Sequence, residues 1–181
     1  MVNDKETQEK RKQAWLGELT NFIVKANKET YAVGKGQVEA ERKGFKELEF
    51  EEGDWRLRDS YSGYFKAPGW TTVYYKGRPV WYMTYGGQGM AEGKENKAPE
   101  TYGFLVKAVM LVSPEMPFRG PEKFSDGEWE YVFKPLKGDI TGFGAVEEIR
   151  QSGDFVFSQD INGGLIVDKD ENRQIVFPWN L

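Results

Sequence analysis

The stretch that decides the fold is Gly53-Asp54-Trp55-Arg56-Leu57-Arg58-Asp59-Ser60-Tyr61, followed after a break by Val73-Tyr74-Tyr75-Lys76-Gly77-Arg78-Pro79-Val80-Trp81. The first segment follows a glycine turn and alternates in character, as a strand with one buried face does. The second segment is typical of a β-hairpin closed by Lys76-Gly77. Together the two segments predict an antiparallel meander built around aromatic side chains.

Strand parity separates the residues of the first segment into two faces. One face carries Trp55, Leu57, Asp59 and Tyr61, and the other carries Arg56, Arg58 and Ser60. Asp59 is therefore the polar break in an otherwise apolar face. A carboxylate there is costly to bury unless it is paired, so it is either a functional acid in a cleft or a structural acid that caps a turn or pairs with an arginine. Arg56 and Arg58 could hold an anion or form a solvated face.

Two amphipathic helices are predicted from apolar residues at spacings of three and four, at about 13–31 and 100–112. Residues 1–12 mix charges of both signs without that period, so we expect them to be frayed or disordered. The length supports one good hydrophobic core, which predicts a single α+β domain over 13–181. Further strands are expected at about 127–133, 143–150, 154–160, 164–168 and 173–177.

The two halves of the chain resemble each other. Matching segments follow in the same order at offsets of 74 to 82 residues: 22–26 with 104–108, 53–55 with 127–129, Gly77 with Gly153, and 86–87 with 163–164. We therefore predict two pseudo-repeated units, each a helix followed by an antiparallel meander, packed into one domain. The copies would span about 13–87 and 100–177, with a flexible linker at 88–99. At the same offset, Asp59 corresponds to Phe133.

The composition excludes several kinds of chemistry. The 181 residues contain no Cys and no His, which rules out thiol nucleophiles, disulfides and catalytic triads that need histidine. We expect no metal site and no cofactor. A net charge of -4 without a basic block makes direct nucleic-acid binding unexpected. No apolar run reaches the roughly 20 residues that span a bilayer, and the N-terminus is not signal-like, so we expect a cytoplasmic protein without membrane partners.

Several segments are similar to an uncharacterised bacterial domain family: residues 22–32, 48–61, 73–81 and 116–121. The resemblance covers nearly the whole chain after about residue 15. Members of that family occur alone or behind Xre-type helix-turn-helix domains in proteins classed as transcriptional regulators. The resemblance implies an effector or sensor module, here without its DNA-binding reader, and it assigns no catalytic residue. Where that family has a histidine ahead of the second Gly-Gly pair, this sequence has Asn162.

Three functions from different classes remain open. The first is a non-catalytic small-molecule-binding domain, sensing or sequestering, with an aromatic pocket closed by Arg58, Asp59 and the loop after Tyr31. The second is a protein-interaction module that uses exposed aromatic and arginine side chains and whose partner could be a second copy in a homodimer. The third is a hydrolase that uses Asp59 with Glu147 or Glu148 as an acid–base pair.

The first function has a defined set of candidate ligand-binding residues, and no catalytic residue is assigned. They are Trp55, Arg58, Asp59, Tyr61, Trp70, Tyr75, Trp81, Tyr85, Arg119 and Glu148. The polar loop at 34–44 is long enough to be functional. Its lone Gly34-Lys35-Gly36 lacks the strand and helix that a phosphate-binding loop requires, so no phosphate site is predicted there.

Overall fold

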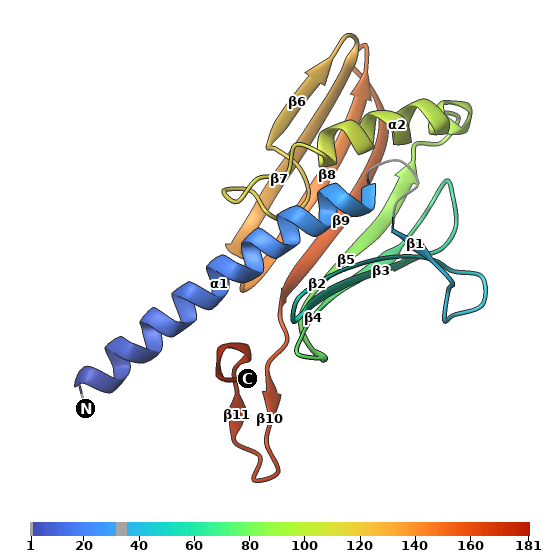
Figure 1. Ribbon diagram of the computed structural model, residues 1–181. Coiled ribbons are helices and arrows are strands. Elements are labelled where there is room, and N and C mark those ends of the chain that lie inside the picture. Colours follow the sequence, from blue (N-terminus) through green and yellow to red (C-terminus); the bar gives the residue numbers. More distant parts are fainter. Residues whose placement is uncertain (1, 32–35) are drawn as a thin grey trace.

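A large antiparallel sheet carries the helices on one of its faces (Figure 1). The computed structural model describes residues 2–31 and 36–181. In this part of the chain, helix α1 (Val2–Tyr31) and the shorter α2 (Ala98–Val109) pack on the same side of the sheet. The predicted α+β class is confirmed.

The main sheet has nine strands in the order β1-β2-β3-β4-β5-β9-β8-β7-β6. They are β1 (Gln37–Val38), β2 (Lys46–Glu52), β3 (Trp55–Tyr61), β4 (Gly69–Tyr75), β5 (Arg78–Met90), β6 (Lys123–Asp126), β7 (Trp129–Asp139), β8 (Gly142–Gln151) and β9 (Asp154–Leu165). The short helix η1 (Glu95–Lys97) precedes α2. After β9 come a separate hairpin of β10 (Asp168–Lys169) and β11 (Ile175–Val176) and the short helix η2 (Pro178–Asn180).

The hydrophobic core lies between the helices and the sheet. On β3 the parity prediction is confirmed, because Leu57 and Asp59 are buried under the helices, whereas Arg58 points to the opposite face. The hairpin predicted at Lys76-Gly77 is also confirmed. Both residues have positive φ, at 50° and 76°, as the tight turns that suit twisted strands require.

Each half contains one helix followed by four main strands, and the last strands, β5 and β9, pair at the centre. The pairing register is the same in both halves at an offset of 76 residues. Val73 pairs with Trp81 before a register shift in the first half, and Ile149 pairs with Phe157 before a register shift in the second. The duplication itself stays a prediction.

Three boundaries differ from the sequence prediction. Helix α1 begins at Val2, because the charged residues before 13 continue the helix as an exposed segment with i,i+4 pairs such as Glu6–Lys10. The expected linker 88–99 is partly regular, since β5 continues to Met90 and η1 follows. Instead of a separate strand at 164–168, β9 continues to Leu165, because its pairing with β5 extends that far.

Two further observations concern single segments. The predicted pocket-closing loop after Tyr31 and part of the glycine pair at 34–36 lie outside the described residues. Among the described residues, neither α1 nor α2 combines the length and the apolar character needed to cross a membrane.

Candidate functional site

A cavity of about 300 Å³ lies between α2, the sheet and residues 62–68, which join β3 to β4. Most of its walls are apolar or aromatic: Leu48, Tyr61, Tyr64, Ala67, Tyr85, Tyr102, Leu105, Val106, Val109 and Phe157. Three buried polar side chains also reach it, those of Asp59, Arg119 and Gln159. An apolar cavity with a few convergent polar groups is the usual composition of a small-molecule site.

Glycines on β5 hold the 62–68 segment against the sheet. Gly89 has a φ of +68°, and a Cβ there would lie 2.2 Å from the carbonyl oxygen of Phe65. The same carbonyl accepts a hydrogen bond of 2.7 Å from the backbone N–H of Met90. On the other side, the hydroxyl of Tyr102 in α2 donates to the carbonyl of Tyr64. The segment is therefore fixed over the cavity from both sides.

Asp59 is 4% exposed and lies at the inner end of β3 beneath this cavity. Its Oδ1 accepts a hydrogen bond of 2.6 Å from Thr71, and its Oδ2 accepts one of 2.8 Å from Tyr85. Burial raises the pKa of Asp59, although these two hydrogen bonds and the positive charge of Arg119 oppose that rise. The fold thus disfavours the ionised form of this carboxyl group.

Arg119 comes from the connection between α2 and β6 and is 5% exposed. Its Nε lies 3.4 Å from Glu147 Oε1, and its guanidinium carbon lies 5.1 Å from the centre of the Tyr85 ring. The next residue, Gly120, allows this approach, because a Cβ there would lie 2.9 Å from the Tyr131 hydroxyl. The turn predicted at Pro117 to Pro121 thus delivers a cation to the buried face.

Glu147 is fully buried on β8 and anchors this cation. Its Oε1 accepts a hydrogen bond of 2.7 Å from the hydroxyl of Tyr131, and its Oε2 accepts one from the amide of Gln159. Together with Asp59 and Arg119, it forms a polar row across the helix-covered face. Within the described residues, no three acidic side chains lie close enough to hold a metal ion.

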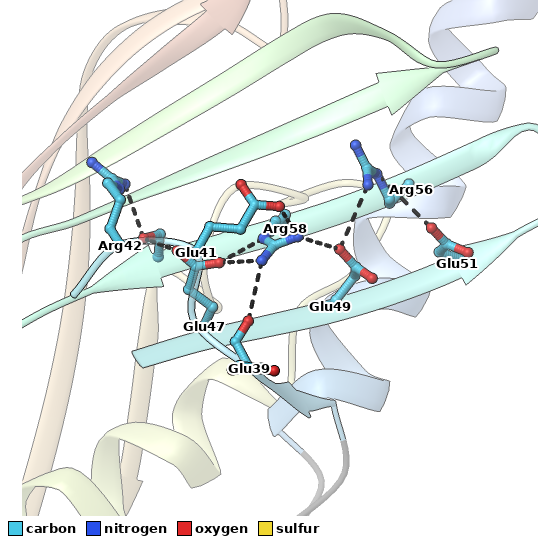
Figure 2. A network of polar contacts seen from close by, with 9 residues as sticks. Glu39, Glu41, Arg42, Glu47, Glu49, Glu51, Arg56 and Arg58 are labelled. Atoms are coloured by element: carbon cyan, nitrogen blue, oxygen red, sulfur yellow. Dashed lines mark hydrogen bonds and ion pairs between the residues drawn. The ribbon is translucent and has the colours of Figure 1, made fainter. Parts of the chain in front are cut away.

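Arg58 lies on the opposite face of β3, away from the cavity (Figure 2). Its guanidinium contacts Glu47 at 2.5 Å, Glu41 at 2.8 Å and Glu49 at 3.2 Å. Burial raises the pKa of Glu47, but hydrogen bonds from Arg58 and Ser60 outweigh that effect and hold it below its ordinary value. Arg58 therefore fastens the segment around Glu41 to the open face of the sheet.

The other predicted residues divide between the cavity and more distant places. Those that line the cavity are Asp59, Tyr61, Tyr85 and Arg119. Trp55 and Tyr75 pack with Trp15 of α1, whereas Trp81 is buried and its indole N–H donates to the carbonyl of Ile140 at 2.9 Å. Trp70 is 46% exposed on the open face and stacks on Tyr82, and Glu148 pairs there with Lys134 at 2.8 Å.

Sequence reasoning missed Tyr102 and Gln159 as cavity residues. Tyr102 precedes the apolar stripe of the predicted helix at 100–112, so its position on the same helix could have suggested it. Gln159 is a polar residue inside a predicted strand, which is the signal that singled out Asp59. Strand periodicity alone does not bring these residues together, because their meeting depends on the β5–β9 pairing.

Residues 59–166 match the family model of a domain of unknown function, DUF5680. The chain belongs to this family. The predicted membership of an uncharacterised domain family is thereby confirmed, while the association with Xre-type domains stays a prediction. The DUF5680 match begins at Asp59 and includes Tyr85, Arg119, Glu147 and Gln159, so the whole polar row lies inside it. No curated protein and no solved structure matches the chain.

Proposed function

We propose that this protein is a non-catalytic small-molecule-binding domain, sensing or sequestering, whose ligand occupies the cavity under α2. The observation that carries the proposal is the convergence of Asp59, Arg119 and Gln159 on an apolar and aromatic space of about 300 Å³. Protein interiors are otherwise packed with few voids larger than a water molecule. Buried polar groups directed at such a space supply the orientation and selectivity that a ligand site needs.

The test is a fragment screen by ligand-observed NMR on the full chain and on two variants. Val106→Trp places a large ring in the cavity from α2. Leu111→Trp adds the same ring just after α2, where the side chain is exposed. We expect fragments to bind the wild-type protein and the Leu111→Trp variant and to lose at least tenfold in affinity for Val106→Trp. An unchanged set of hits with Val106→Trp, or no hits at all, would contradict the proposal.

Protein interaction is a second candidate, supported by the open face of the sheet. Trp70 is exposed there and stacks on Tyr82 with ring centres 5.2 Å apart, and Arg56 lies over Tyr74 at 4.2 Å. Aromatic and arginine side chains are the residues that dominate binding energy at interfaces. The ligand proposal ranks above it, because the cavity gathers buried polar groups, whereas this face presents mainly partly exposed ones.

The hydrolase alternative would need two carboxyl groups on one side of the sheet. Glu148 does not meet this requirement with Asp59, since the two side chains lie on opposite faces. Glu147 shares the face of Asp59, but its two oxygens already accept hydrogen bonds from Tyr131 and Gln159. This arrangement favours a structural role for Glu147 over proton transfer.

We also infer that the two halves are copies of one helix-plus-meander unit. What supports this is the common pairing register, including matching register shifts at Val73/Tyr74 and Ile149/Arg150. Equivalent turns add to it, because Lys76 and Ser152 have φ of 50° and 51° and each precedes a glycine of positive φ. Unrelated hairpins have little reason to share both features.

A further inference from the structure

The buried charges beside the cavity do not balance among the described residues. Arg119 faces two carboxyl groups, Glu147 at 3.4 Å and Asp59, whose pKa its charge lowers. One cation thus serves two acids in a region that excludes water. Burial nevertheless raises the pKa of Asp59, so the fold relieves the excess negative charge by favouring the protonated acid.

The cavity walls already bind cations. The guanidinium of Arg119 lies over the ring of Tyr85 at 5.1 Å, and the ammonium of Lys46 lies 5.9 Å from the ring of Tyr61. Tyrosine rings attract cations through their negative faces, and cages of such rings recognise substituted ammonium groups. Tyr64 and Tyr102 add two further rings to the same walls. Lys46 itself is exposed, so solvent and salt screen its charge.

We propose that the cavity binds a small organic cation, an alkylammonium, with its charge beside Asp59 and among the tyrosine rings and its apolar substituents against Leu105 and Val109. The proposal rests on the proposed function, since it names the ligand class of the same cavity. An anionic ligand fits less well, because the guanidinium that would receive it already contacts Glu147, and Asp59 would repel it.

Cation binding is expected to depend on pH through Asp59. A positive charge beside this carboxyl group favours its ionised form, so binding releases a proton, and affinity rises with pH until Asp59 is ionised in the free protein. The charged and titratable groups around Asp59 come from six parts of the structure: Lys46 and Glu47 of β2, Tyr61 of β3, Tyr85 of β5, Tyr102 of α2, Arg119 of the loop and Glu147 of β8. Burial raises the pKa of Tyr61 and, to about 12, that of Tyr102, so both rings stay neutral.

The experiment is titration calorimetry on the full chain with three probes of similar size. Choline is the cation, 3,3-dimethylbutan-1-ol is its neutral isostere, and 3,3-dimethylbutyrate is the anion. We expect choline to bind at least tenfold more tightly than the alcohol and the butyrate to bind least. Asp59→Asn should lower choline affinity about tenfold and leave the alcohol unchanged. Asp54→Asn, in the exposed turn before β3, should change neither.

The outcomes separate this inference from the proposed function. If the alcohol or the butyrate binds as well as choline and Val106→Trp abolishes that binding, the cavity is a ligand site but not a cation site. If none of the probes binds while NMR fragments do, the ligand class is wrong and the binding function stands. A choline affinity that is the same in Asp59→Asn, or that does not rise between about pH 5 and pH 8, overturns the role of Asp59. The three-probe comparison needs only wild-type protein, so it decides the cation preference even if the variant fails to fold.

Discussion

The two halves of the sheet share one pairing register but end in different ways. In the first half, the seven residues 62–68 connect β3 to β4, and small side chains, Ala67 and Gly69, face the space under α2. In the second half, β7 and β8 are joined by a tight turn, and the positions equivalent at an offset of 76 hold Phe143 and Ala145. Phe143 packs on Phe118 at 4.3 Å and fills the corresponding space. The cavity therefore arises from side-chain size and connection length, and the strand pairing is common to both ends.

The two buried carboxyl groups differ in the same way. Glu147 is fully buried, accepts hydrogen bonds from Tyr131 and Gln159, and lies beside Arg119. Asp59 accepts hydrogen bonds from hydroxyl groups and borders the cavity. We infer that the first carboxyl group stabilises the fold and that the second is kept for a ligand.

The largest expected effect on stability is that of Glu147→Ala. It leaves the guanidinium of Arg119 buried beside a lost partner, and removal of one member of a buried ion pair typically costs about 3–5 kcal/mol. Urea denaturation should show this loss. Glu148→Ala is the control, because its pairing with Lys134 on the open face should contribute about 1 kcal/mol or less. Equal losses in the two variants would break the comparison.

Asp59→Asn should have the opposite sign at neutral pH. The pKa of Asp59 is raised in the folded protein, so the stability that this acid contributes is complete below its unfolded pKa of about 3.9 and is lost as pH rises through the folded value. The unfolding free energy of Asp59→Asn minus that of the wild type should therefore increase from about pH 4 upward and then level off. Denaturation series with Asp54→Asn as control measure this. A difference that falls with pH would show that Asp59 is ionised and stabilising.

Ala67→Phe should have the smallest effect on stability and converts the first end towards the second. The cavity has room for the ring, so we expect the unfolding free energy to change by about 1 kcal/mol or less, below the usual cost of overpacking. Binding of NMR fragments and of choline should nevertheless be lost. Ala91→Phe, at a half-buried alanine outside the cavity, is the control. Retained binding in Ala67→Phe would show that the two ends differ for another reason.

Local periodicity predicted much of the fold. The alternation along β3 placed Asp59 on the buried face, and Lys76-Gly77 identified the turn between β4 and β5, because both signals depend on neighbouring residues alone. The combination of Arg58 and Asp59 in one pocket could not be predicted in this way. Successive residues of a strand point to opposite faces, and both faces carry aromatic side chains, so the pattern does not reveal which face receives the helices.

The rest of the candidate site depends on contacts between distant parts of the chain. Gln159 meets the cavity because β9 pairs with β5, and Arg119 reaches Glu147 because the loop after α2 folds back over β8. No local pattern specifies these approaches. The sequence signal that was available, a polar residue at a core position of a strand, predicts that a side chain is unusual but does not identify its partner.

The central pairing of β5 with β9 has a consequence for synthesis of the chain. When the ribosome has released the first half, β5 (Arg78–Met90) is a long strand with one edge unpaired, because its partner ends only at Leu165. Unpaired edges of this length invite pairing with other chains. The nascent protein thus carries its greatest aggregation hazard between the completion of β5 and the arrival of β9, although the finished sheet conceals that edge at its centre.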